Sequence, residues 1–382
     1  MDLLKSIFKG DKVIWIIEVF SAASTLTYKS GDHWGPITQH SIILMVGAVV
    51  VVFLHNVPYK WFQVFPVFLY PISLVLLAFV TLMGIITGDR VNGAARWMTF
   101  MGLQFQPSEL AKMAVIIAVS FILSKRQDEE GANPKAFKYI MILTGLVLLL
   151  IAPENLSTAM LLFGVVFMMM FIGRVAAKKL LLLAGGLVLI VALGVGTVVA
   201  IPAKTLHNTP GLHRLETWQN RIKGFFDKDE VPAAKFDIDK DAQIAHARIA
   251  IATSHVVGKG PGNSIQRDFL SQAFSDFIFA IVIEEMGLIG GIFVVFLYLC
   301  LLMRAGRIAQ KCERTFPAFL VMGIALLLVS QAILNMMVAV GLFPVTGQPL
   351  PLVSKGGTST LINCAYIGMI LSVSRYTAHL EE

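Results

Sequence analysis

The sequence has little charge: 14% of its 382 residues are Asp, Glu, Lys or Arg, and 56% are hydrophobic. A soluble domain carries about 25% charged and roughly 45–50% apolar residues. Together with a mean hydropathy of +0.75, this scarcity excludes a water-soluble globule, a disordered chain and a nucleic-acid-binding domain. The net charge of +7 is therefore interpreted by where the cations lie along the chain.

Cysteine is scarce as well, with three residues in the whole chain. Cys300 and Cys364 fall in apolar segments and Cys312 falls in a short loop, so neither a disulfide framework nor a metal-ligand cluster is expected. The sequence also has no P-loop, no GxGxxG motif and no internal repeat of about 20–50 residues. Nothing in it points to nucleotide-driven chemistry.

Long apolar runs are what the sequence has instead. A helix needs about 20 mostly apolar residues to cross a bilayer, and ten runs approach that length between charges, prolines or glycines. The sequence therefore predicts an all-α polytopic membrane protein with ten transmembrane helices, near residues 13–28, 40–55, 61–87, 109–124, 137–152, 157–174, 179–203, 276–303, 316–346 and 357–376.

The cations orient these spans. With a cytoplasmic N-terminus, the inner segments hold 16 Lys and Arg, whereas the short outer segments hold 4, namely Lys29, Arg90, Arg96 and Lys355. Cytoplasmic loops carry the excess of Lys and Arg in membrane proteins. Both termini are therefore expected in the cytoplasm.

Residues 204–275, between the seventh and eighth predicted spans, form a 72-residue extracytoplasmic loop within a single membrane domain, 1–382. Loops of this length are usually functional or carry their own structure. Leu215–Phe226 and Ala242–Ser254 mix apolar and polar residues at helical spacing, which predicts two amphipathic helices along the outer leaflet. The alternative is a packed cap that binds no ligand.

Ionisable residues inside predicted spans are functional candidates, because an unpaired charge is costly in lipid. Glu109 and Lys112 share a helix face at i,i+3, so they form either a structural ion pair or a contact to a charged substrate. Asp276 lies at the outer mouth of the eighth span, where an aspartate can also cap the helix. Glu284 and Glu285 lie deeper in that span and are expected to pair with a cation inside the bundle.

Several outer residues are candidates for binding an anionic lipid head group. Arg96, Lys355 and Lys259 lie near the level of the aspartate, and cations there would hold phosphates. Ser354 and Gln106 belong to the same sequence blocks and are included as substrate-binding candidates. The alternative for each charged residue is a solvated loop side chain.

Five blocks resemble the SEDS family, the shape, elongation, division and sporulation proteins FtsW, RodA and SpoVE. Their order, their spacing and the ten-span topology agree over nearly the whole chain. The blocks are Asn92–Trp97, Gln106–Lys112, Gly258–Ser264, Ser275–Gly287 and Asn335–Ser359.

The resemblance implies a peptidoglycan glycosyltransferase that polymerises lipid II on the outer face of the bacterial inner membrane and releases undecaprenyl pyrophosphate. It implies that Asp276 is the catalytic residue, that Arg96 is the arginine of the ARW block, and that Glu109 and Lys112 are the intramembrane pair. It also implies a class B penicillin-binding protein and other division-machinery membrane proteins as partners. The wording of the GNS and LPLVS segments favours a division protein of the FtsW type over an elongation protein of the RodA type.

The mechanism we expect is inverting glycosyl transfer with Asp276 as the base. Arg96, then Lys355 and Lys259, would stabilise the departing pyrophosphate. A divalent cation, Mg²⁺ or Mn²⁺, suits pyrophosphate oxygens, although no metal-ligand motif accompanies it.

The chain departs from the family pattern in three places. Leu270–Ser275 reads LSQAFS where Leu-Pro-Glu-Ala-His-Thr is common, so no role for that glutamate or histidine is transferred. Lys355 replaces an aromatic residue before the double glycine, and Ala152–Asn155 replaces a QPD-type motif. The competing functions are a transporter that flips lipid-linked precursors, which a ten-helix bundle also suits, and a non-enzymatic division scaffold.

Overall fold

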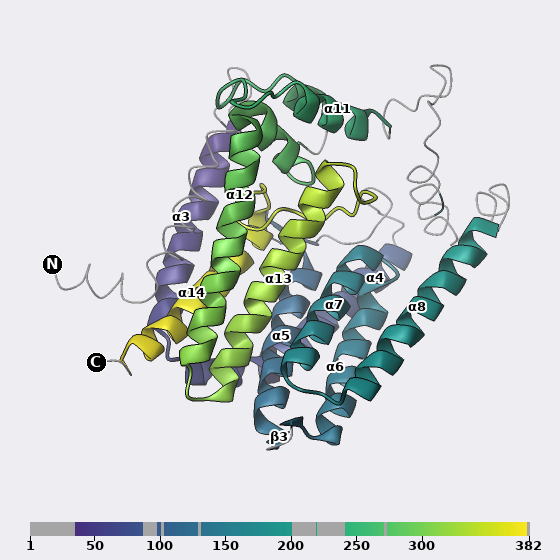
Figure 1. The fold of residues 1–382 in the computed structure, drawn as a ribbon, viewed down its shortest axis with the longest axis vertical. Helices are drawn as coiled ribbons and strands as arrows, with labels where there is room; N and C mark the ends of the chain where they lie inside the picture. The colour runs from purple at the N-terminus through teal and green to yellow at the C-terminus, as the bar shows by residue number, and fades with distance from the viewer. Residues whose placement is uncertain are drawn as a thin grey trace.

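The protein was analysed as a computed structural model, which describes residues 35–86, 98–100, 103–128, 131–200, 219, 241–270 and 273–379. In these ranges the chain forms a bundle of long helices (Figure 1). Two small antiparallel hairpins are additions to the predicted all-α fold. They pair β1 (Met98–Phe100) with β2 (Leu103–Phe105) and β3 (Gln127–Asp128) with β4 (Gly131–Ala132).

Nine helices in the described ranges coincide with nine of the ten predicted spans; the predicted span at 13–28 and the predicted helix at Leu215–Phe226 lie outside the described residues. The nine are α3 (Gly35–Asn56), α4 (Phe65–Ile86), α5 (Pro107–Lys125), α6 (Pro134–Ile151), α7 (Leu156–Ile172), α8 (Ala177–Ala200), α12 (Ile278–Lys311), α13 (Thr315–Ala339) and α14 (Gly357–His379).

Length and apolarity identify seven of these helices as candidate spans within the described ranges; the apolar parts of α3 and α7 are shorter. The helices begin where the sequence offers start signals. Asn133 caps α6 by accepting a hydrogen bond from the Lys135 amide over 3.0 Å, and Asn155 caps α7 by accepting one from the Thr158 amide over 3.2 Å. Such caps satisfy amides that a helix start leaves unpaired.

The helices differ strongly in burial. In α5, 78% of the most apolar stretch is buried, and in α14 83%, whereas in α8 the share is 6%. Figure 1 accordingly shows α5 inside the bundle and α8 at its edge. The exposed apolar side chains of the outer helices suit a lipid environment, because lipid does not penalise them as water does. The described part of the chain is thus a polytopic helical membrane protein.

The end of α13 comes seven residues before the predicted end of that span. The amide of Gly341 donates to the Val338 carbonyl over 3.0 Å, and the amide of Leu342 donates to the Met337 carbonyl over 2.8 Å. This pattern is a Schellman motif, which needs a residue with positive φ after the helix. Gly341 supplies it with φ 77°. The released segment, residues 341–356, folds back over the end of the bundle.

The predicted helix at Ala242–Ser254 is present as α11 (Asp241–Ala252), which lies across the end of the bundle where α12 begins (Figure 1). A 3₁₀ turn, η4 (Gln266–Phe269), follows it. The helix buries Ala247 and Ala250 in a small apolar cluster that includes Phe277 and Ile278 of the α12 start. This second core, separate from the large core of the bundle, supports the candidate site.

Helix α12 is broken at Gly287, whose φ of 73° and ψ of −175° are not helical. The segment His255–Gly260 crosses the break and pairs with the freed backbone groups. The amides of Lys259 and Gly260 donate to the carbonyls of Glu284 and Glu285 over 3.0 and 2.8 Å. Backbone groups at membrane depth need such partners, so the crossing segment stabilises the break.

Candidate active site

Asp276 lies in the turn that precedes α12. Phe277 occupies the N-cap position of that helix and makes no side-chain cap hydrogen bond. The Asp276 side chain is half-buried, and the hydroxyl of Ser275 donates to its Oδ1 over 3.0 Å. The carboxylate is therefore positioned by its neighbour, in a residue that keeps part of its surface exposed.

The segment between α13 and α14 fixes the turn from one side. The Lys355 amide donates to the Phe274 carbonyl over 2.8 Å, and the Ser354 hydroxyl donates to the Ser275 carbonyl over 2.7 Å. Ser354 is itself held, because its Oγ accepts a hydrogen bond from the Leu350 amide over 2.7 Å. Two of the predicted substrate-binding residues thus adjoin Asp276 in the fold.

Asn335 fixes the turn from within α13. Its Nδ2 donates to the Asp276 carbonyl over 2.9 Å and to the Gln348 carbonyl over 2.8 Å, and its side chain is buried. Gln348 in turn donates to Thr158 Oγ1 of α7 over 2.6 Å. Three successive carbonyls before α12 therefore accept hydrogen bonds from three donors far away in the sequence.

Glu109 and Lys112 form an ion pair in α5, with Lys112 Nζ 2.8 Å from Glu109 Oε1 and the two side chains 0% and 2% exposed. Lys112 also donates to Gln331 Oε1 over 2.9 Å, and Gln331 Nε2 donates to the Pro349 carbonyl over 3.0 Å. Pro349 belongs to the segment that holds Ser354. The ion pair is therefore linked through Gln331 to the loop beside Asp276.

Gln106 is buried at the start of α5. Its Nε2 donates to Ser108 Oγ over 2.9 Å. Together with Glu154 and Asn155 it lines a narrow cavity between α4 and the ends of α5 and α6. Its described contacts are those of a residue that shapes the N-terminus of α5.

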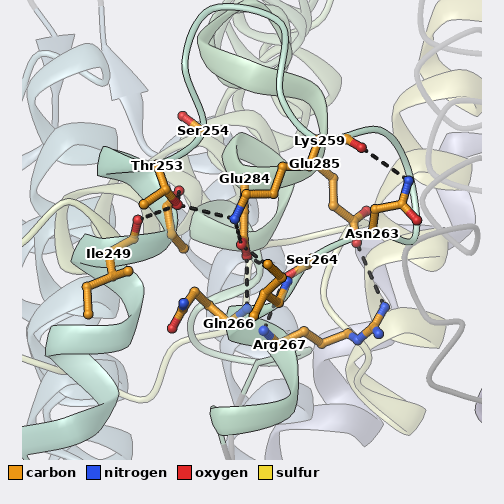
Figure 2. Close-up of polar contacts among 12 residues, drawn as sticks. Ile249, Thr253, Ser254, Lys259, Asn263, Ser264, Gln266, Arg267, Glu284 and Glu285 are labelled. Carbon is orange, nitrogen blue, oxygen red and sulfur yellow. Dashed lines mark hydrogen bonds and ion pairs between the residues drawn. The ribbon is translucent and has the colours of Figure 1, made fainter.

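Lys259 lies against a glutamate of α12 rather than in open solvent (Figure 2). Its Nζ is 2.6 Å from Glu284 Oε1 and 3.3 Å from Thr253 Oγ1, and its side chain is 27% exposed. The hydroxyl of Ser264 donates to the other Glu284 oxygen over 2.5 Å. The positive charge of Lys259 is therefore neutralised within the chain.

The amides of Ile265 and Gln266 also donate to Glu284, over 3.2 and 3.3 Å. Arg267 Nη1 lies 3.9 Å from Oε1 of the neighbouring Glu285, which is fully buried (Figure 2). Both glutamates thus face cations, but the cations come from the 253–267 segment and not from another helix. A buried carboxylate needs such partners, so the pair anchors that segment to α12.

Arg96, Ser271 and Gln272 lie outside the described residues. Asn335, Gln331 and Gln348 take part in the site but were not among the predicted site residues. The signal was available, because Gln331 and Asn335 are polar residues at i,i+4 in an apolar span. Neutral amides carry no charge, so the presence of ionisable groups inside spans does not reveal them.

The described residues do not include any group of three or more His, Cys, Asp or Glu side chains that could hold a metal ion. The carboxylates near the site are also committed to other partners: Glu109 to Lys112, and Glu284 to Lys259. Within the described ranges, the side chains around Asp276 therefore do not form a metal site by themselves.

The fold and the site together define a class of protein. It is a helical membrane protein that holds an acidic turn fixed at one end of its bundle. The family of cell cycle proteins FtsW, RodA and SpoVE matches residues 7–379. The chain belongs to this family.

Named relatives agree with this family assignment, and solved structures agree with the fold. The chain is 33% identical over 362 residues to the probable peptidoglycan glycosyltransferase FtsW of Trichlorobacter lovleyi, covering 94% of this chain and 89% of the relative. It is 33% identical over 366 residues to the probable peptidoglycan glycosyltransferase FtsW of Geobacter sp., covering 94% of this chain and 92% of the relative.

A solved chain from a peptidoglycan synthase complex superposes on this chain with a TM-score of 0.75 at 24% identity, covering 97% of this chain and 99% of that one. The rod shape determining protein RodA of Thermus thermophilus superposes with a TM-score of 0.65 at 23% identity, covering 96% of this chain and 97% of that one. At these identities the solved structures support the fold.

Proposed function

We propose that Asp276 is the general base in the reaction of this chain. The chain is a peptidoglycan glycosyltransferase of the FtsW type, as its family and its relatives at 30–33% identity indicate. The proposed reaction is polymerisation of lipid II into glycan strands with release of undecaprenyl pyrophosphate. The observation that carries the role of Asp276 is the fixed turn, whose three carbonyls are held around an aspartate that is only half-buried.

In the proposed step, Asp276 accepts the proton of the GlcNAc 4-hydroxyl of the acceptor. The hydroxyl oxygen forms a bond to the anomeric carbon of the MurNAc donor while the bond from that carbon to the pyrophosphate breaks. The electron pair leaves with the pyrophosphate, and the configuration at the anomeric carbon inverts. A base needs to lie within hydrogen-bond reach of the proton that it takes, and the rigid turn keeps the carboxylate in one place.

Cations would stabilise the departing pyrophosphate. Lys355 is well placed for this role, because its own amide binds the Asp276 turn. Arg96 stays in the proposal on the family resemblance alone, and Ser354 and Gln106 stay as substrate-binding candidates. Lys259 would first have to leave Glu284. A Mg²⁺ or Mn²⁺ ion bound to the pyrophosphate would enter with it and is treated as part of the substrate.

The proposed topology has ten spans, both termini in the cytoplasm and the Asp276 turn on the outer face of the bacterial inner membrane. The excess of cations in the predicted inner loops supports this orientation. Cysteine labelling from each side of the membrane, at cysteines introduced at Asp268 and at Glu313, which are both exposed, tests it. We expect the first to react from outside and the second from inside.

The proposed partners are a class B penicillin-binding protein, which would crosslink the new glycan, and other membrane proteins of the division machinery. Support comes from the similarity in fold to a chain of a peptidoglycan synthase complex. Co-purification of the chain with a class B penicillin-binding protein of the same organism tests this assignment.

The decisive experiment is polymerisation of labelled lipid II by the purified protein in proteoliposomes. We expect Asp276→Asn to abolish glycan formation while the protein stays folded. Asp268→Asn is the matched control, because Asp268 is an exposed aspartate of the preceding segment that pairs with Arg267. Full activity of Asp276→Asn would remove Asp276 from the role of base.

The same preparation separates the competing functions. Glycan chains formed without ATP support the enzyme, whereas translocation of lipid II with no glycan formed supports the transporter. Normal division in a strain that carries Asp276→Asn would support the scaffold. Septal rather than side-wall localisation of a fluorescent fusion distinguishes the FtsW type from the RodA type.

A further inference from the structure

The cations near the Asp276 end of the bundle fall into two groups. Lys112, Lys259 and Arg267 each lie within 4.0 Å of a carboxylate oxygen. Arg248 and Lys355 form no ion pair with any residue in the described part of the chain. The unpaired cations are the ones whose charge is free to act on an anionic substrate.

Arg248 lies on α11, with an exposed side chain. Its guanidinium packs against Gly341, and Nε and Nη2 lie 3.0 Å from the point where a β-carbon of residue 341 would stand. Gly341 is the positive-φ residue that ends α13. The absence of a side chain there lets the guanidinium approach the backbone closely.

Helix α11, which carries Arg248, lies at the same end of the bundle as the proposed base. Asn335 lies near the end of α13, six residues before Gly341, and it holds the carbonyl of Asp276. Ala247, next to Arg248, is buried in the same cluster as Phe277, next to Asp276. Figure 1 shows α11 lying over this end of α12 and α13. Arg248 and Asp276 therefore belong to one end of the bundle.

We propose that Arg248 binds the diphosphate of the lipid-linked donor sugar. This inference rests on the proposed function and assigns it a further substrate-binding residue. The diphosphate is bonded to the anomeric carbon, so it lies within one sugar ring of the carbon that the acceptor attacks. A guanidinium presents a rigid fork of donors that matches phosphate oxygens in pairs. Its interaction strengthens as the bond to the anomeric carbon breaks and charge grows on the diphosphate.

The proposal also separates Arg248 from Lys259. Because Glu284 neutralises Lys259, its removal is expected to loosen the 253–267 segment rather than to remove a phosphate contact. Arg248 has no such intramolecular task among the described residues. Its replacement should change affinity for the diphosphate and leave thermal unfolding unchanged.

The test measures binding to the full-length Asp276→Asn protein in nanodiscs of zwitterionic lipid, so that no turnover occurs. The two probes are undecaprenyl pyrophosphate and undecaprenol, which share the lipid tail but not the diphosphate. We expect Arg248→Gln to weaken undecaprenyl pyrophosphate about tenfold, the factor that corresponds to about 1.4 kcal/mol. We expect Arg248→Lys to lose less affinity for undecaprenyl pyrophosphate than Arg248→Gln. We expect both variants to bind undecaprenol with unchanged affinity.

Lys60→Gln is the control, because Lys60 is an exposed cation in the turn η2 (Tyr59–Gln63), which lies by the α12–α13 connection at the opposite end of α12 from Asp276. The proposal is overturned if Arg248→Gln binds undecaprenyl pyrophosphate as tightly as the Asp276→Asn protein without it. It is also overturned if Arg248→Gln weakens the binding of both probes equally. Phosphatidylglycerol that competes as well as undecaprenyl pyrophosphate also overturns it, because Arg248 would then be a site for membrane phospholipid. Failure of the unsubstituted protein to polymerise lipid II would instead refute the proposed function.

Discussion

The side-chain amide of Asn335 donates to the backbone carbonyl of Asp276 over 2.9 Å, from near the C-terminal end of a helix that starts 39 residues later in the chain. The same nitrogen donates to Gln348 over 2.8 Å. One buried amide thus joins the acidic turn to the segment that contains Ser354 and Lys355. We infer that the position of the Asp276 carboxylate depends on Asn335.

Asn335→Ala should reduce the rate of lipid II polymerisation by about 10²-fold, because a displacement of about 1 Å at a catalytic group has an effect of that size. The reduction should appear in kcat more than in KM, since Asn335 does not touch the substrate. Asn56→Ala, which removes an exposed amide at the end of α3, serves as the control. Unchanged kcat for Asn335→Ala would show that the turn holds its shape without this amide.

Lys112→Met should destabilise the protein by about 3–5 kcal/mol, because it leaves Glu109 buried without its cation. The double variant Glu109→Gln/Lys112→Met should recover most of that loss, since no charge then remains uncompensated. Thermal unfolding of the two single variants and the double variant in detergent measures the coupling. Additive effects of the two single substitutions would contradict an energetic link between the pair.

Gly287→Ala should lower the unfolding temperature strongly, because φ is 73° and a β-carbon there would lie 2.1 Å from the Val256 carbonyl oxygen. Gly306→Ala in the same helix is the matched control. A β-carbon at Gly306 meets nothing within 4 Å, and alanine favours a helix by about 1 kcal/mol over glycine. Equal unfolding temperatures of the two variants would exclude a structural need for the break in α12.

Cys312 should resist alkylation at neutral pH. Burial raises the pKa of its thiol from 9.0 to about 11, and only the thiolate is nucleophilic. The folded state therefore favours the protonated thiol, and the labelling rate should keep rising about tenfold per pH unit between about pH 8 and 10. Iodoacetamide labelling of a Cys300→Ser/Cys364→Ala protein measures this. A plateau near pH 9, as expected for the unfolded chain, would contradict it.

Much of the fold follows from apolar periodicity and charge. A bilayer requires about 20 apolar residues per span, so α4 through α8 and α12 through α14 could be located from composition and length. The turn at Gly341 was harder to foresee, because Phe343 and Val345 prolong the apolar run beyond the true end of α13. The break in α12 was missed for a similar reason: helical spacing continues on both sides of Gly287.

The candidate site was predictable only in part. Asp276, Ser354 and Lys355 were named from sequence blocks, and the fold brings them to one turn. Lys259 was named for phosphate binding from its level in the membrane alone, whereas its contact is Glu284. A sequence gives the depth of a charged residue but not its nearest neighbour.

The amino-acid sequence alone specified the class of protein, the places of nine helices and the ionisable residues worth attention. It misplaced some helix ends, because α12 continues to Lys311 beyond its predicted end at 303 and α13 stops at Ala339 before its predicted end at 346. These properties depend on local composition, which the lipid environment selects directly. Packing determined which polar groups meet. The hydrogen bonds that join Asp276, Ser275 and Lys112 to their partners span 59, 79 and 219 residues, and no local pattern encodes them. Such contacts form because a buried polar group needs a partner, and the assembled bundle alone determines which partner is within reach.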